Sequence, residues 1–143
     1  MKNSGQSLVE VIIAVGAMSL LMVALLALVS LSIRSNRLSQ SRAEAVALAE
    51  EGIELMRAYR DLSWTDLSSK APGNYGLEKN WTVETGSWID CPAGKNIDNF
   101  FTRCVEVIAD GANQVNIQVV VSWQEGSQTY QTVQTTNLSL WER

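Results

Sequence analysis

The chain of 143 residues contains no histidine, only two cysteines and only two prolines. Without histidine it lacks the commonest general base and the usual nitrogen ligand of transition metals. Two cysteines without histidine are too few for a zinc site. Because the sequence also offers no pairing of a nucleophile with a base, we expect neither an enzyme nor a protein that holds a cofactor or metal.

Basic residues are also fewer than acidic residues. Lys and Arg total 11 against 15 Asp and Glu, which gives a formal net charge of -4. A protein that binds nucleic acid needs a clustered basic face. We therefore expect no nucleic-acid partner.

Charge is absent altogether from Val11 to Val29. At about 1.5 Å per residue, a helix over this run is roughly as long as the hydrocarbon core of a bilayer is thick. The run is longer than the apolar part of a secretory signal, and no clear cleavage site of the A-x-A kind follows it before Arg34. The sequence therefore predicts a transmembrane helix rather than an ordinary signal peptide.

Glu10 is the one ionisable residue at the start of this apolar segment. A carboxylate at mid-membrane costs about 2.5–3.5 kcal/mol on insertion scales, and less toward the edge. Such a residue is a functional-site hypothesis that requires a partner. The alternative is that Glu10 extends to the lipid headgroups.

The residues around Glu10 resemble a known processing signal. Gly5-Gln6-Ser7-Leu8-Val9-Glu10, followed by Val11-Ile12-Ile13-Ala14, is similar to the class III signal of type IV prepilins and type II secretion pseudopilins. The resemblance implies that a membrane aspartic protease, prepilin peptidase, cuts between Gly5 and Gln6 and usually methylates the new amino terminus. Family members usually have Phe or Met where this chain has Gln6.

Cleavage after Gly5 would create a positive amine at the end of an apolar rod. At about 4 Å and an effective dielectric near 20, Glu10 of a neighbouring subunit would gain roughly 4 kcal/mol from that amine before desolvation. Because this is comparable to the cost of burying the carboxylate, the pair would set register more than it would drive assembly.

The helical pattern continues beyond the apolar run. From Ser35 to Leu62 there is no proline, and apolar residues recur at steps of three and four. We predict one continuous helix from about Ser7 to Asp61, roughly 80 Å long. Its first half would lie in lipid or in a filament core, and its second half would bury one stripe against a domain. The members of that stripe are Leu38, Ala45, Leu48, Ala49, Gly52, Leu55, Met56, Tyr59 and Leu62.

Turn residues dominate residues 63–98, and strand patterns follow. Strands are predicted over 100–109, over 115–123, where apolar residues alternate with mostly polar neighbours, and over 129–141, with a hairpin turn at 125–127. A short strand over 81–84 is a further expectation. Val133 breaks the alternation of the last strand, which points to a bulge.

These elements predict an α+β fold in which a long N-terminal helix is packed by an antiparallel sheet of three to four strands. Its similarity to the pilin fold comes from the resemblance. The expected organisation is a leader peptide over 1–5, the transmembrane or filament-core half of the helix over 6–33, and an extracytoplasmic head over 34–143. The head would comprise an amphipathic helix over 34–62, a loop region over 63–98 and the sheet over 99–141.

Cys91 and Cys104 both follow the membrane segment. If that part is exported, a disulfide is the natural interpretation, whereas a reducing compartment would leave two free thiols. Cys104 shares the parity of Thr102 and Glu106, which places it on the outward face of its strand. In the family that the chain resembles, a loop bounded by a disulfide often displays surface chemistry.

The resemblance extends more weakly beyond the membrane segment. The residues from Leu48 to Glu54, and Tyr59-Arg60-Asp61 with Trp64, are similar to minor pilins of the pilus modification protein V kind and to the minor pseudopilin I. The leading hypothesis is a structural subunit of a type IV pilus or related filament, and the resemblance favours a minor subunit. A pseudopilin of a type II secretion system, a competence filament and an uncleaved membrane-anchored binding or adhesin module are the alternatives.

The resemblance also implies partners and a location. The partners would be other pilin subunits, prepilin peptidase, the inner-membrane assembly platform and, for the precursor, the membrane itself. The precursor would span the cytoplasmic membrane once and end as part of a cell-surface or periplasmic filament. Arg34, Arg37 and Arg42 follow the apolar run and, by the positive-inside rule alone, would favour the opposite orientation.

Overall fold

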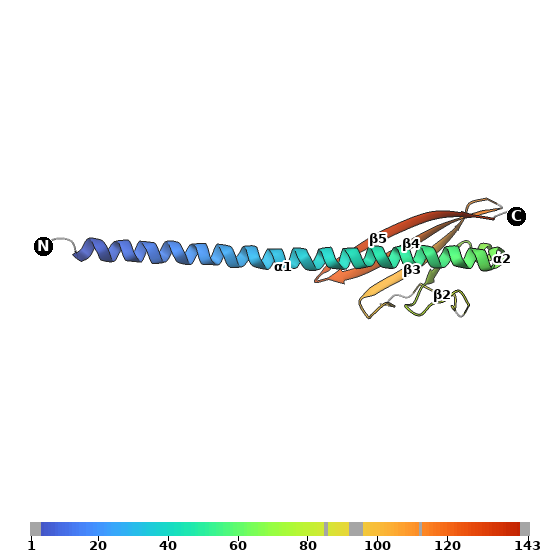
Figure 1. The fold of residues 1–143 in the computed structure, drawn as a ribbon, viewed down its shortest axis with the longest axis horizontal. Helices are drawn as coiled ribbons and strands as arrows, with labels where there is room; N and C mark the ends of the chain where they lie inside the picture. The colour runs from blue at the N-terminus through green and yellow to red at the C-terminus, as the bar shows by residue number, and fades with distance from the viewer. Residues whose placement is uncertain (1–3, 85, 92–95, 112, 141–143) are drawn as a thin grey trace. The chain divides into compact units, whose positions relative to one another are not determined.

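The computed structural model describes residues 4–84, 86–91, 96–111 and 113–140, and the side chains from Leu8 onward. The described part contains two helices and five strands (Figure 1). The chain divides into two compact units, Met1–Gln40 and Ser41–Arg143, called here the N-terminal unit and the C-terminal unit.

Helix α1 spans Ser4–Leu62, in close agreement with the helix that the apolar periodicity predicts. It ends where Ser63 adopts an extended conformation, with φ -154° and ψ 93°. The Ser63 hydroxyl accepts a hydrogen bond from the main-chain N–H of Asp66 and so caps a second helix, α2, over Trp64–Ser69. This short helix lies in the region that the sequence predicted as loop.

The C-terminal unit contains a five-stranded antiparallel sheet in the order β2-β1-β3-β4-β5. The fold is therefore α+β, a long N-terminal helix with an antiparallel sheet, and it is consistent with a pilin-like fold. The strands are β1 (Gly73–Gly76), β2 (Ile89–Asp90), β3 (Phe101–Ala109), β4 (Gln114–Glu125) and β5 (Gln128–Ser139).

The core of the C-terminal unit lies between helix residues 41–62 and the inner face of β3 and β4. Gly52 shows how close this packing is, because a Cβ atom at that position would lie 2.8 Å from Cγ1 of Val119. Every second residue of β4 is buried, as the alternation of its sequence predicts. The buried helix residues are Ala45, Ala49, Gly52, Ile53, Met56 and Tyr59.

Besides α2, the structure differs from the sequence-based expectation in four places. The sheet has two short strands, β1 and β2, in the region expected to be loop. Residues 81–84 do not form a strand, and Val83 and Glu84 lie in a turn. β5 pairs with β4 without a slip from Gln128 to Ser139, so no bulge is present at Val133. Leu62 is exposed, although the helical pattern placed it on the buried stripe. Residue 141 lies outside the described residues.

Candidate functional site

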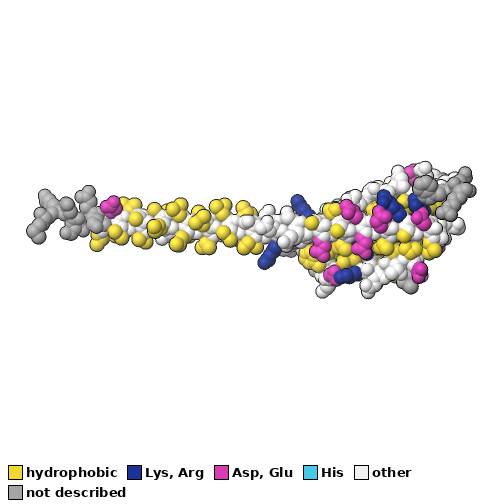
Figure 2. Space-filling model, viewed as in Figure 1, with side chains coloured by type: hydrophobic (Ala, Val, Ile, Leu, Met, Phe, Trp, Pro, Cys, Tyr) yellow, Lys and Arg dark blue, Asp and Glu magenta, His cyan; other side chains and the backbone are white. Residues whose placement is uncertain are grey.

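The N-terminal unit presents apolar side chains on every side of α1. From Leu8 to Ile33 its large apolar residues are between 50% and 74% exposed. Figure 2 shows these side chains gathered along the visible face of the helix. Burying one such side chain is worth about 1.5–3 kcal/mol. A helix that is apolar all round is stable only inside lipid or among other apolar surfaces.

Among the described residues, this helix is the one long and apolar enough to cross a bilayer. That is compatible with a protein that spans the membrane once. The Ser19 hydroxyl donates a hydrogen bond to the carbonyl oxygen of Val15 at 2.8 Å, so the helix satisfies this polar group internally. Internal satisfaction is what a polar group in hydrocarbon requires.

Glu10 is exposed on α1, two residues after the first described side chain. Between Ser4 and Ile33 it is the one ionisable residue in the sequence. Gly5 and Gln6, the predicted cleavage site, belong to the first turns of α1, but their side chains lie outside the described part of the structure. Residues 1–3 of the predicted leader also lie outside it.

Small residues interrupt the apolar surface of the N-terminal unit. No heavy atom outside the helix backbone lies within 4 Å of a Cβ built at Gly16, so this surface is open. Small residues allow two helices in an apolar medium to approach closely. The surface therefore suits helix–helix packing. The small residues are Ala14, Gly16, Ala17, Ser19, Ala24 and Ala27.

In the C-terminal unit, Arg103 is a fully buried cation that joins three segments of chain. Its guanidinium donates to the carbonyl oxygens of Leu48 at 3.2 Å, Leu77 at 3.3 Å and Glu78 at 3.1 Å. It also lies 3.1 Å from Oε2 of Glu51. Arg103 thereby connects α1, the segment after β1 and strand β3.

The electrostatics of this site favour a structural role. Burial lowers the pKa of Arg103 below its ordinary value, and the charge of Glu51 and its hydrogen bond oppose that shift. An arginine side chain stays protonated in proteins, so the core holds a positive charge. The three carbonyl oxygens and the Glu51 carboxylate supply the partners that a buried charge requires.

The sequence carries a signal for Arg103 in the alternation of β3. Arg103 has the same parity as Phe101, Val105 and Val107, all of which are buried in β3. An arginine in the middle of an inward-facing row must find partners in the core. Its partners come from positions up to 55 residues away, which no local pattern specifies.

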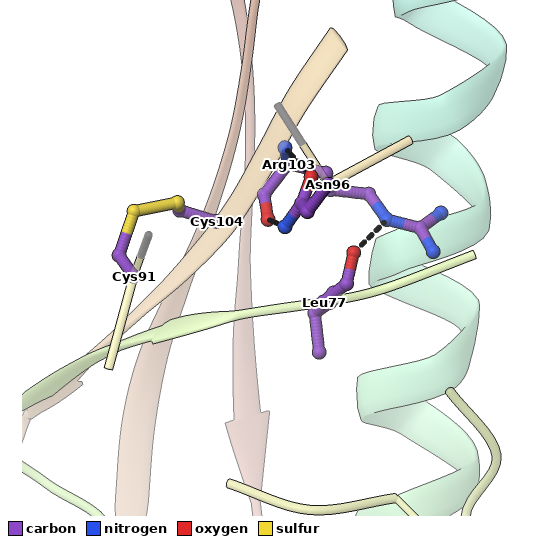
Figure 3. The surroundings of a disulfide bond; sticks show 5 residues. All are labelled: Leu77, Cys91, Asn96, Arg103 and Cys104. Atoms are coloured by element: carbon purple, nitrogen blue, oxygen red, sulfur yellow. Dashed lines mark hydrogen bonds between the residues drawn. A yellow bond between two sulfur atoms is a disulfide. The ribbon is translucent and has the colours of Figure 1, made fainter. Parts of the chain in front are cut away.

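Asn96 is the first described residue after residues 92–95, and its side chain binds the main chain of Arg103. The N–H of Arg103 donates to Oδ1 of Asn96 at 2.7 Å, and Nδ2 of Asn96 donates to the carbonyl oxygen of Arg103 at 2.8 Å. Figure 3 shows this exchange, together with the guanidinium directed toward α1. This pair of bonds anchors the segment before β3 against that strand.

The structure joins Cys91 and Cys104 in a disulfide, with their Cα atoms 5.5 Å apart. The two side chains Arg103 and Cys104 leave β3 in opposite directions (Figure 3). Cys104 therefore faces away from α1, on the side that its parity predicts, although the bridge leaves it only 7% exposed. The disulfide connects the segment after β2 to the outer face of β3.

Aromatic side chains pack together near the end of α1. Trp88 makes edge contacts with Tyr59, Tyr75 and Trp81, with ring centroids 4.9–5.8 Å apart. Such arrangements are favourable beyond the apolar area they bury. The structure places Trp88 half-buried in this cluster.

The described residues contain no group of three or more Cys, Asp or Glu side chains placed to hold a metal ion. Asp98, one of the acidic residues in the loop before β3, binds Nζ of Lys79 at 2.5 Å. Comparisons with family models, with curated proteins and with solved structures returned no match for this chain. Its function must therefore be argued from its own residues.

Proposed function

We propose that this chain is a structural subunit of a type IV pilus or a related filament. In this proposal prepilin peptidase removes residues 1–5, and the subunit is assembled through the apolar segment of α1. The C-terminal unit is then the head that each subunit contributes outside the membrane. The protein catalyses no reaction itself.

The observation that carries the proposal is the exposure of apolar side chains from Leu8 to Ile33 on all sides of one helix. Such a helix is stable in lipid, and it stays stable on leaving lipid only if neighbouring helices rebury its surface. The small residues from Ala14 to Ala27 leave room for these neighbours. A bundle of such helices is the core that a filament of this kind requires.

Glu10 supplies the polar contact within that bundle. Hydrolysis of the peptide bond after Gly5 frees the α-amino group of Gln6, which is largely protonated near neutral pH. In the proposed filament this ammonium lies against the Glu10 carboxylate of an adjoining subunit. Removing one member of a buried ion pair leaves the other uncompensated, so a subunit placed out of register is disfavoured.

The disulfide supports export of the C-terminal unit. Disulfides persist in oxidising compartments and are rare in the cytosol. The bond between Cys91 and Cys104 therefore favours an orientation with the head outside the cytoplasm. The positive charges of Arg34, Arg37 and Arg42 alone favour the reverse orientation. We give the disulfide more weight than these charges.

One competing function shares most of these observations. An uncleaved, membrane-anchored binding module would also have an apolar helix and an exported head with a disulfide. The arrangement of Gly5 and Glu10 favours the filament subunit, because an anchor needs neither residue. A pseudopilin of a secretion system would share the entire assembly mechanism with a pilus subunit.

The deciding experiment is to determine the amino terminus of the protein isolated from membranes and from sheared cell-surface material. The proposal predicts a chain that starts at Gln6, with or without an added methyl group, in both fractions. A chain that retains Met1 in the membrane and is absent from sheared material would support the anchored module instead. The mass of the intact protein distinguishes these outcomes, and a catalytically inactive prepilin peptidase is the matched control.

A further inference from the structure

Among the described residues no strand pairs with the outer edge of β5, and this strand has none of the usual protections. Sheet edges are normally shielded by shortness, charge, proline or a bulge. β5 has 12 residues, it contains no charged residue and no proline, and its pairing with β4 shows no slip. The opposite edge, β2, has only two residues. Among the described residues no strand lies beyond β5, which Figure 1 shows at the margin of the sheet.

The turn before β5 determines which main-chain groups face this edge. Gly126 and Ser127 form a two-residue loop between Glu125 and Gln128, which are paired residues. Residues that flank such a loop hydrogen-bond to each other. Even-numbered residues of β5 therefore direct their N–H and C=O groups to β4. The odd-numbered residues direct theirs to the open side. These are Thr129, Gln131, Val133, Thr135, Asn137 and Ser139.

Val133 is the one large apolar residue of this odd-numbered set. Two antiparallel copies of β5 place outward-directed residues opposite one another, so a two-fold axis at Val133 sets this residue against the partner's Val133 and pairs the residues from Thr129 to Asn137. The same register sets Gln131 against the partner's Thr135. No like charges meet along the strand, because β5 has none.

The outer face of the sheet matches this register. Cys104 pairs with Val120, and Val120 pairs with Val133, so an apolar row runs from the disulfide to the edge. Val133, which is 39% exposed, ends the row in the single chain. A two-fold axis at Val133 would continue the row into a second copy. Polar rows flank it on both sides: Thr102, Ser122 and Gln131 on one, and Glu106, Gln118 and Thr135 on the other.

We infer that the C-terminal unit self-associates through β5, with a second copy of this chain as the partner strand in an antiparallel, two-fold pair centred on Val133. The axis stands perpendicular to the sheet and reverses the direction of helix residues 41–62 in the second copy. Neighbours within one filament would have parallel helices. The contact therefore joins subunits of two oppositely directed assemblies, and it is separate from the helix packing of the proposed function.

Disulfide trapping in the full chain tests the inference and its register. Residues opposite one another in a hydrogen-bonded pair have Cα atoms about 5.5 Å apart, a spacing that a disulfide spans. Val133→Cys should form a disulfide-linked homodimer under mild oxidation. Gln131→Cys and Thr135→Cys should each remain monomeric alone and should cross-link when mixed. Gln118→Cys, on the same face but in central strand β4, is the matched control.

A second variant tests the contact without cross-linking. Val133→Lys places two ammonium groups at the axis, so the concentration at which the protein associates should rise by about tenfold or more. Gln118→Lys adds the same charge on β4 and should leave the concentration at which the protein associates unchanged. Failure of Val133→Cys to cross-link above the Gln118→Cys level overturns the inference, as does linkage of Gln131→Cys to itself. The start of the mature chain, measured in the same samples, reports on the proposed function independently.

Discussion

The guanidinium of Arg103, in β3, lies 3.1 Å from the carboxylate of Glu51, in α1. The Arg103 side chain is fully buried, whereas the Glu51 side chain is 53% exposed. The buried cation therefore depends mainly on the three carbonyl oxygens that accept its hydrogen bonds, and the carboxylate adds a partner at the edge of the core.

This asymmetry predicts unequal effects of the two residues on stability. Arg103→Ala removes the donor of three hydrogen bonds and leaves a cavity in the core, so unfolding of the C-terminal unit should become easier by about 3 kcal/mol. Glu51→Gln keeps an acceptor at a half-exposed position and should cost under about 1 kcal/mol. Urea unfolding of the full chain in detergent, followed by tryptophan fluorescence, measures both. Equal effects would contradict this account of the site.

The contact between Gly52 and Val119 predicts a strict size limit in α1. Gly52→Val introduces side-chain atoms where a Cβ alone would lie 2.8 Å from Cγ1 of Val119, so we expect a loss of about 1–3 kcal/mol from overpacking. Ala47→Val, on the exposed side of the same helix, is the matched control and should change stability by less than about 0.7 kcal/mol. Thermal unfolding of the two variants tests this prediction, and a neutral Gly52→Val would refute it.

The disulfide closes a loop with a sequence separation of 13 residues. In the chain-entropy model a loop of this size contributes about 3 kcal/mol by restricting the unfolded chain. Replacing both cysteines by serine should lower the midpoint of thermal unfolding, and a reducing agent should lower the wild-type midpoint by the same amount. The double variant should no longer respond to the reducing agent. A wild-type midpoint that is insensitive to reduction would mean that the bond contributes no stability.

The raised pKa of Tyr59 predicts that the C-terminal unit loses stability at alkaline pH. Burial raises the pKa of the Tyr59 hydroxyl group above the ordinary value of 10.0, and the hydrogen bond to Asp66 raises it further. Because the folded-state value is the higher one, the contribution is complete below about pH 10 and is lost as the pH rises through the folded pKa. Tyr59→Phe should flatten the decline in stability above pH 10, measured by urea unfolding at a series of pH values. If the decline in stability above pH 10 were the same in Tyr59→Phe, groups other than Tyr59 would be its cause.

Periodic elements could be predicted from the sequence, whereas elements that depend on distant contacts could not. The three- and four-residue steps of α1 and the alternation of Val115 to Trp123 arise from burial of one face, which a single segment records. Strand β1 has no such alternation, and it forms because Gly73–Gly76 pairs with β3 about 30 residues later along the chain. Residues 81–84 combine aromatic and β-branched residues, but Trp81 is buried in an aromatic cluster and the chain turns there.

The residues of the candidate site also differ in how far the sequence predicts them. Glu10 stays a prediction, which the sequence makes because a carboxylate beside a long uncharged run is costly whatever the fold. The pairing of Cys91 with Cys104 could be predicted because the chain has only two cysteines. Arg103 was missed because its partners, such as Leu48 and Glu78, are main-chain carbonyls whose residue identity carries no signal.

The most direct test of the central claim replaces Glu10 by alanine and follows the protein into sheared filaments. Removing the carboxylate leaves the proposed Gln6 ammonium unpaired inside the bundle, so incorporation should fall by about tenfold or more while cleavage after Gly5 continues. Thr65→Ala, an exposed change in α2, is the control and should incorporate normally. If Glu10→Ala reached filaments at the wild-type level, the proposed role of Glu10 would be wrong. If the wild-type protein kept residues 1–5 and was absent from sheared filaments, the proposed function would be wrong.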